Sequence, residues 1–218
     1  MGFVMSVPSN DTDHLLKRAA DGDQNSWSAL LARHTERLRR LVAFRLDQRL
    51  QGRVDPSDVI QEASLEAWQH LQDYLKDPKL PFFLWLRGIA GNKLRELHRY
   101  HLGTQMRDAG REVSIYRGTL PEATSAALAA QLLGHLTQPS VAAMRAEIKV
   151  RLQEALNQMD PLDREVLALR HFEFLSPHET AEVLGIKEKA AAMRYVRALR
   201  RLKEILTALP GGLWGTMS

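Results

Sequence analysis

Apolar residues recur three or four positions apart along two long stretches of this 218-residue chain, and this spacing limits the possible fold more than any other feature. Leu30, Leu38, Leu41 and Val42 illustrate the repeat. Such spacing places one apolar stripe on an α-helix, whereas a half-buried strand would alternate every second residue. Leu, Ala, Arg and Glu, which favour helices, are also frequent. We therefore expect an all-α protein.

Proline and glycine divide the helical pattern into two stretches with a different kind of segment between them. Residues 102–139 contain repeated Gly and Pro and little periodicity, which predicts a linker. Residues 122–133 within it could form a short Ala-rich helix. The flanking stretches, residues 11–101 and 140–207, are each long enough for a small helical domain. Residues 208–218 are expected to form a C-terminal tail.

The composition excludes several chemistries. The chain has no cysteine, so it can form neither disulfides nor thiolate metal sites, and it suits a reducing cytoplasm. The longest strongly apolar run, Phe82–Leu86, is far shorter than the roughly 20 residues of a membrane-spanning helix, so no membrane insertion is expected. The sequence contains no glycine-rich phosphate loop and no convincing set of metal ligands. We expect a protein that is not an enzyme and that uses no cofactor or metal.

A helix-turn-helix is predicted in the second stretch. The segment Ser176-Pro-His-Glu179 combines an N-cap serine, a proline at the first helical position and the glutamate of a capping box. The helix that it opens ends at Leu184-Gly185, and a longer helix follows from Glu188 to about Leu206. A short helix, a glycine turn and a longer helix form the layout of a helix-turn-helix.

The longer of these two helices is strongly basic on one side. Residues 187–204 contain seven Lys or Arg against two Glu, in a chain whose formal net charge is only +4. Such a helix can lie in the major groove, with its first residues near base edges and its later arginines on phosphates. The candidate DNA-contacting residues are Lys187, Lys189, Ala190, Met193, Arg194, Arg197, Arg200 and Arg201. The alternative is a solvated basic face without a ligand.

A second candidate surface lies on the helix expected from Pro81 to about His101. When residues are projected at about 100° each, Phe83, Leu86 and Leu94 share one face, which predicts a core contact. Trp85 falls on the opposite side, so we expect a solvent-directed tryptophan on a basic helix face. The other residues of that face are Asn92, Arg95 and Arg99.

Three segments together resemble conserved regions of one family. Asp58-Val-Ile-Gln-Glu62 is similar to region 2.2 of the sigma-70 family of RNA polymerase sigma factors, and Phe83-Leu-Trp-Leu-Arg-Gly-Ile-Ala-Gly-Asn92 is similar to region 2.4. The helix-turn-helix resembles region 4.2. Because only regions 2 and 4 are present, the chain resembles the extracytoplasmic-function group. The resemblance covers nearly all of residues 14–101 and 145–206.

The resemblance implies a bacterial, cytoplasmic, non-catalytic subunit that directs transcription initiation. In the family, the Asp-x-x-Gln-Glu face binds the coiled coil of the polymerase β′ subunit, which implies polymerase binding by Asp58, Gln61 and Glu62. Residues 11–101 would also recognise and melt the −10 DNA, and residues 140–207 would bind the −35 element. The implied −10 residues are Tyr74, Phe82, Trp85, Asn92, Arg95 and Arg99. The implied partners are core RNA polymerase, through its β′ and β subunits, promoter DNA and, as a further candidate, an anti-sigma factor.

The basic helix departs from the family pattern at one point. Many members carry Gly-Thr-Val-Lys/Arg-Ser-Arg there, whereas this chain has Lys189-Ala-Ala-Ala-Met-Arg194 and keeps only the final arginine. Alanine and methionine can contact thymine methyl groups, but their side chains form no hydrogen bonds with base edges. The −35 sequence that other members prefer therefore does not carry over to this chain.

The residues alone leave two other functions open. A helix-turn-helix transcriptional regulator that does not bind core polymerase would explain the second stretch, but it has no reason to carry both segments 58–62 and 83–92. A nucleolytic or RNA-modifying enzyme would need a constellation of carboxylates or histidines. His178-Glu179 does not supply one, because Glu182 stands where a zinc-binding helix needs a second histidine.

Overall fold

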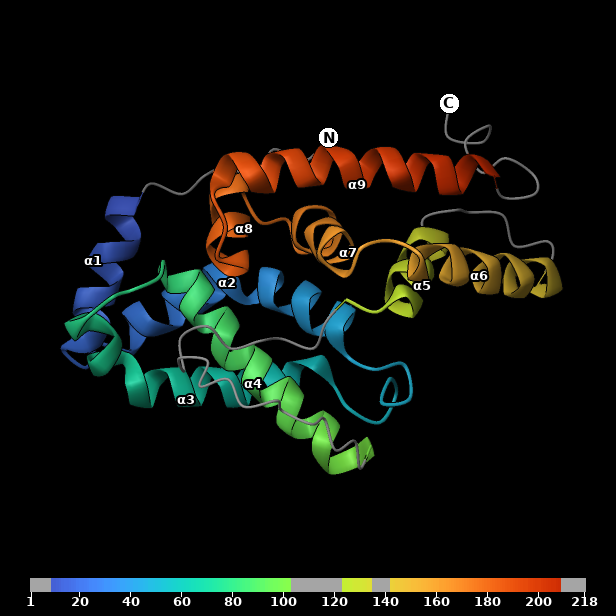
Figure 1. Cartoon of the computed structure of the whole chain (residues 1–218). Helices are drawn as coiled ribbons and strands as arrows, with labels where there is room; N and C mark the ends of the chain where they lie inside the picture. The colour runs from blue at the N-terminus through green and yellow to red at the C-terminus, as the bar shows by residue number, and fades with distance from the viewer. Residues whose placement is uncertain (1–8, 103–122, 135–141, 209–218) are drawn as a thin grey trace.

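Helices make up the regular structure of the protein. The computed structural model describes residues 9–102, 123–134 and 142–208, and within these ranges every element is helical apart from an isolated bridge between Gln51 and Val54. The predicted all-α class is confirmed. No helix in these ranges is both long and apolar enough to cross a bilayer. The helices form an N-terminal unit and a C-terminal unit (Figure 1).

The N-terminal unit consists of α1 (Ser9–Ala20), α2 (Gln24–Arg45), α3 (Pro56–Lys76) and α4 (Phe82–Leu102). Helix α2 contacts the other three, so it lies at the centre of this unit. Asp55 caps α3 by accepting a hydrogen bond from the Ser57 backbone N–H, with Pro56 in the first turn, as predicted. Leucines from α2, α3 and α4 that are at most 2% exposed fill the interior. They include Leu30, Leu38, Leu71, Leu86 and Leu94.

The C-terminal unit consists of α5 (Ser125–Gly134), α6 (Ala142–Asn157), α7 (Pro161–Leu167), a π-helical turn η2 (Ala168–Phe172), α8 (Pro177–Leu184) and α9 (Glu188–Ala208). The capping box between Ser176 and Glu179 forms as predicted. Gly185 ends α8 with a φ of 64°, a left-handed conformation that glycine adopts without strain. Helices α8 and α9, with the turn between them, have the predicted helix-turn-helix order.

Helix α5 lies within the segment predicted to be a linker. The short Ala-rich helix expected there is present, and its Leu128 and Ala129 are fully buried in the core of the C-terminal unit. Just before α5, the Ala123 backbone N–H donates a hydrogen bond to Glu165 of α7 at 3.0 Å. Residues 123–134 therefore pack as part of the C-terminal unit. The other parts of the expected linker lie mostly outside the described residues.

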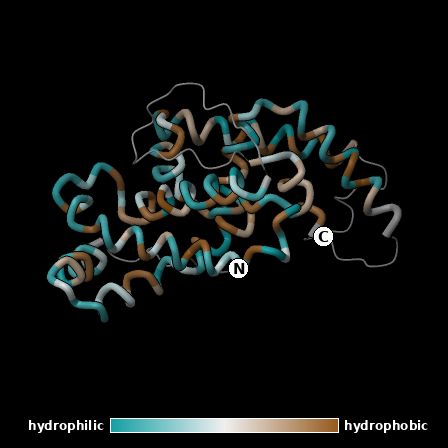
Figure 2. Tube along the Cα trace, turned by 90° about the horizontal axis from the view of Figure 1, so that it is seen from below, coloured by the Kyte–Doolittle hydropathy of each residue, from teal (hydrophilic) through white to brown (hydrophobic). Residues whose placement is uncertain are grey.

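The two units pack directly against each other. Leu169 and Leu175 of the C-terminal unit are buried in the same core as the leucines of α2 and α4. In the other direction, Phe44 of α2 is buried in the C-terminal core and stacks on Phe172, with ring centroids 5.2 Å apart. Figure 2 shows apolar residues interspersed with polar ones along the helices, as expected for amphipathic helices that share an interior.

Candidate nucleic-acid interface

The basic side of α9 is open to solvent. Helix α9 runs along one edge of the molecule and contacts α7 and α8 (Figure 1). The exposed candidates are Lys187, Lys189, Ala190, Met193, Arg197, Arg200 and Arg201. Met193 is 65% exposed. The exposure of these residues agrees with the predicted DNA-facing side, and their contact with DNA stays a prediction.

Arg194 is the exception among the α9 candidates. It is half-buried, and its Nη1 donates a hydrogen bond at 2.9 Å to Oδ1 of Asp163, which is in the first turn of α7. A second carboxylate, that of Asp160, lies 3.8 Å from the same nitrogen. Arg194 is therefore less open than the other candidates on this helix, and its contact with DNA stays a prediction. The reason is that α7 packs against α9 at this position.

The acidic motif of α3 is also open to solvent. Asp58, Gln61 and Glu62 are all exposed, at spacings that place them on one side of the helix. Leu65, one turn further along, is 61% exposed. Leu65 is not among the candidates that the sequence indicates, because leucine is more often buried than exposed. The motif and Leu65 together form a surface with acidic, amide and apolar groups.

The aromatic candidates of the −10 surface are buried. Tyr74, Phe82 and Trp85 are each 4% exposed, so the expectation of a solvent-directed Trp85 is wrong. Trp85 stacks on Tyr74 with ring centroids 4.5 Å apart, and the Tyr74 hydroxyl donates a hydrogen bond to the Leu80 carbonyl at 2.9 Å. Burial raises the pKa of Tyr74 to about 12. A helical projection missed this packing because the covering ring comes from a different helix.

The two halves of α4 differ in exposure. Residues 82–91 are all buried, whereas Asn92 and Arg95 are half-buried and Arg99 is exposed. Arg95 donates a hydrogen bond to the Asn92 side chain at 2.5 Å. The accessible part of the proposed −10 surface is therefore the second half of α4. Part of the first half is covered by the C-terminal unit, as the contacts of Arg87 demonstrate.

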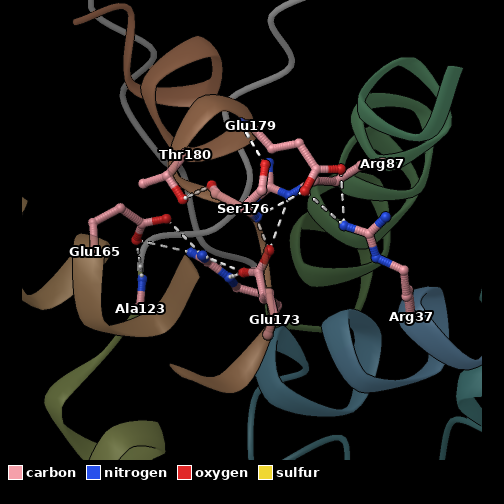
Figure 3. Close-up of polar contacts among 9 residues, drawn as sticks. Arg37, Arg87, Ala123, Glu165, Glu173, Ser176, Glu179 and Thr180 are labelled. Atoms are coloured by element: carbon pink, nitrogen blue, oxygen red, sulfur yellow. Dashed lines mark hydrogen bonds and ion pairs between the residues drawn. The ribbon is translucent and has the colours of Figure 1, made fainter. Parts of the chain in front are cut away.

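A buried cluster of charged residues joins the two units, and no local sequence pattern indicates it. Glu173, in the turn after η2, accepts hydrogen bonds from Arg45 of α2 at 2.7 Å and from Arg87 of α4 at 2.9 Å. The side chains of these three residues are at most 5% exposed. Arg45 also donates to Glu165 of α7 at 3.0 Å. Figure 3 shows Glu165 and Glu173 within one group of polar contacts.

The opposite charges in this cluster change the pKa values of its members. Burial alone would raise the pKa of Glu173, but the facing guanidinium groups of Arg45 and Arg87 outweigh burial and lower it. Burial also lowers the pKa of Arg87, whereas Glu173 and Glu165 outweigh burial at Arg45 and raise its pKa. Glu173 therefore remains ionised where a lone buried carboxylate would take up a proton.

A second ion pair crosses between the units at the start of the helix-turn-helix. Arg37 of α2 donates through one nitrogen to both carboxylate oxygens of Glu179, at 2.9 and 3.0 Å. Glu179 is the capping-box residue of α8, and it also accepts from the Ser176 backbone N–H (Figure 3). The Arg37 guanidinium lies 3.6 Å from the ring centroid of Phe83. The first turn of α8 is thereby held against α2 and α4.

His34 lies beside this second ion pair. Its ring faces Phe82 and Phe83, with centroids 5.6 and 5.5 Å away, and neither of its ring nitrogens has a hydrogen-bond partner among the described residues. Burial, reinforced by the charge of Arg37, lowers the pKa of His34 to about 4. The imidazole is therefore neutral near pH 7.

Comparisons with known proteins agree with the sequence and the fold. Residues 149–202 match the model of the family described as sigma-70, region 4. The RNA polymerase sigma factor NccH of Alcaligenes xylosoxydans xylosoxydans is 30% identical over 93% of this chain and 97% of its own length. The RNA polymerase sigma factor CnrH of Cupriavidus metallidurans is 31% identical over 91% of this chain and 96% of its own.

A solved structure extends the similarity to three dimensions. The chain is similar, with a TM-score of 0.52 and 27% identity, to the structure of CnrH in complex with the cytosolic domain of CnrY. The match covers 91% of this chain and 98% of the solved one. Both helical units are therefore represented in the matched protein.

Proposed function

This chain belongs to the sigma-70 family of RNA polymerase sigma factors, and from that premise we propose that α9 binds the −35 promoter element in the major groove. The proposal rests on the exposed basic side of α9, which follows α8 and the turn at Gly185. Lys189, Ala190 and Met193 lie in the first turns of the helix, where a recognition helix reaches base edges. The phosphate-contacting residues are then Lys187, Arg197, Arg200 and Arg201.

We assign the exposed side of α3 to core polymerase. Asp58 and Glu62 supply negative charge, Gln61 supplies an amide, and Leu65 supplies apolar area on the same side of the helix. Such a surface is complementary to a partner helix that carries basic residues around an apolar contact. The family resemblance identifies that partner as the β′ coiled coil. The β subunit completes the polymerase interface.

Recognition and melting of the −10 element are assigned to α4. Asn92, Arg95 and Arg99 offer amide and guanidinium donors on its second half. Arg87 lies in the first half and is held by Glu173 of the C-terminal unit, so DNA can reach that part of α4 only after the two units separate. We therefore propose that the packed arrangement is a resting state and that binding of core polymerase opens it.

A regulatory protein is a further proposed partner. The similar chain CnrH is found in a complex with the cytosolic domain of CnrY, which supports the proposal that this chain also has a protein partner. We propose that an anti-sigma factor binds this chain in the bacterial cytoplasm. An anti-sigma factor that stabilises the contact between the two units would keep α4 covered.

Co-elution with core RNA polymerase in size-exclusion chromatography tests the proposed function. The full chain should co-elute with the polymerase, and the double variant Asp58→Arg with Glu62→Arg should not, because a basic partner would then face like charges. The matched control is Asp73→Arg with Asp77→Arg, which makes the same charge change at the same spacing at the other end of α3. The control should co-elute like the unmodified chain.

The two outcomes separate the proposed function from its main alternative. A helix-turn-helix regulator that is not a sigma subunit would bind duplex DNA without co-eluting with core polymerase. Co-elution of the Asp58→Arg, Glu62→Arg variant at the unmodified level would contradict the assignment of α3. Loss of co-elution in both double variants would indicate a general charge effect instead of a defined docking surface.

A further inference from the structure

Asp163 holds two arginines of the recognition helix at once. It lies in the first turn of α7, and its side chain is only 11% exposed. Oδ1 accepts a hydrogen bond from Arg194 at 2.9 Å, and Oδ2 accepts one from Arg197 at 3.3 Å. The Arg194 side chain is 30% exposed and that of Arg197 is 61% exposed. Asp163 therefore draws the inner arginine toward α7 and leaves the outer one mostly in solvent.

We propose that Asp163 is a specificity-determining positioning residue of the proposed −35 interface. Its carboxylate withdraws Arg194 from base edges and orients Arg197 toward the DNA backbone. Sequence preference then depends on Lys189, Ala190 and Met193. This inference rests on the proposed function, because it concerns how α9 reads a duplex. It reverses the sequence-based expectation that Arg194 reads bases.

The chemistry of guanidinium recognition supports this role. An arginine that is free at the groove makes paired hydrogen bonds to O6 and N7 of guanine, which is the commonest specific contact in protein–DNA complexes. Asp163 engages Nη1 of Arg194, one of the donors that such a pair needs, and a shielded carboxylate holds a donor more strongly than an exposed one. Asp163 thus occupies Arg194 in place of a guanine, and the first turns of α9 present mainly apolar side chains to the groove.

The electrostatic arrangement also explains why a carboxylate is tolerated near DNA. An acidic group at such an interface would repel phosphates if it were alone. Here the guanidinium groups of Arg194 and Arg197 face the carboxylates of Asp163 and Asp160, so the negative charge at this point is balanced. An aspartate that served only the dipole of α7, as an acid in the first turn can, would not need to contact α9.

Selection of bound sequences from a randomised duplex library tests the proposal with the full chain. We expect Asp163→Asn to acquire a guanine preference of about tenfold or more at one position, because Arg194 becomes free to read a base. The salt dependence of binding should also become steeper by about one unit, because removal of the Asp163 carboxylate leaves one more positive charge uncompensated at the DNA surface. The double variant Asp163→Asn with Arg194→Ala should lose the new guanine preference and select the same sequences as the unmodified chain.

Two control variants separate positioning from a structural role. Asp163→Glu restores the carboxylate and should restore the original preference. Glu204→Gln removes an exposed carboxylate that pairs with Arg201 on the same helix, and it should leave the selected sequences unchanged. Thermal melting of every variant identifies any that has lost its fold, and the double variant and Asp163→Glu keep the comparison interpretable if Asp163→Asn is destabilised.

The outcomes are distinguishable. Identical selected sequences and salt slopes for Asp163→Asn and the unmodified chain would overturn the inference and leave the proposed function standing. A new preference that persists in the double variant would also overturn it, because Arg194 would not be the residue released. If the unmodified chain enriches no sequence, the −35 assignment fails and the inference fails with it.

Discussion

The Arg45 guanidinium of α2 donates through Nε to Glu173 at 2.7 Å, and the two side chains are 1% and 2% exposed. The pair crosses the boundary between the two helical units, and Arg87 of α4 reaches the other oxygen of the same carboxylate. Removing two charges from water costs several kcal/mol, and such a pair contributes little net stability compared with apolar packing. Such a pair instead fixes how the two units align, because either buried charge becomes costly when the other is displaced.

Glu173→Gln should destabilise the protein strongly. The substitution preserves the shape of the side chain but leaves Arg87 buried without its counter-charge and Arg45 with Glu165 alone. Removing one member of a buried pair typically costs about 3 to 5 kcal/mol. Chemical denaturation measures the free energy of unfolding. Glu204→Gln is the control, because it breaks an exposed pair with Arg201 and should cost less than about 1 kcal/mol. A loss below about 1 kcal/mol for Glu173→Gln would mean that water already reaches the cluster.

Local sequence signals predicted the helices well, and they did so for a physical reason. The capping box at Ser176, the Asp55-Pro56 start of α3 and the short helix before Gly134 depend on residues a few positions apart. The interface between the units depends on distant residues: Arg45 and Glu173 are 128 positions apart, and nothing in their local sequence distinguishes them from ordinary surface charges. Such a pairing follows only from the packed fold.

The functional surfaces show the same contrast between local signals, which the sequence reveals, and contacts between distant residues, which it does not. The exposure of Asp58 and Glu62 follows from the helical spacing around them. Trp85 was misplaced because a helical projection identifies opposite sides but cannot tell whether a second element covers the polar side. Arg194 is more covered than a projection indicates for the same reason, since Asp163 comes from a different helix.

His34→Phe should stabilise the protein at acidic pH. The lowered pKa means that the unfolded chain takes up a proton near pH 6.5, whereas the folded chain does so only near pH 4. The stability that depends on neutral His34 is therefore complete above about pH 6.5 and is lost as the pH falls toward 4. From the size of the pKa shift, this loss is roughly 3 kcal/mol, and a phenylalanine avoids it.

Thermal melts at a series of pH values between 7 and 4 measure the effect. The charged groups that act on His34 are Arg33, Arg37 and Glu179, and all remain in the variant. His70→Phe, which replaces an exposed histidine of α3, should follow the pH profile of the unmodified chain. If His34→Phe loses stability with falling pH as steeply as the unmodified chain, the His34 ring is already hydrated in solution.

Trp85→Ala should affect the stability of the protein more directly than its binding to DNA. The ring is 4% exposed and stacks on Tyr74, so its removal should lower the free energy of unfolding by about 3 to 5 kcal/mol. Trp85→Phe retains a ring in the same space and should cost less. Tyr100→Ala is the comparison, because Tyr100 is an aromatic residue of the same helix that is 85% exposed, and it should leave the melting temperature nearly unchanged. Equal melting temperatures for Trp85→Ala and Tyr100→Ala would place the Trp85 ring in solvent.

Core polymerase should separate the two units, and the absence of cysteine makes this measurable. The Lys149 ammonium of α6 lies 3.3 Å from the Gln48 side chain, which follows α2, so labels at these two positions start close together. In the variant Gln48→Cys with Lys149→Cys, pyrene on both cysteines should give excimer fluorescence in the free chain. Addition of core polymerase should abolish the excimer signal, because α4 engages DNA only after Glu173 releases Arg87.

A mixture of the two singly labelled chains controls for contact between molecules. An excimer signal that persists in the co-eluting complex would mean that the chain works in its packed arrangement, and −10 recognition would then depend on the second half of α4 alone.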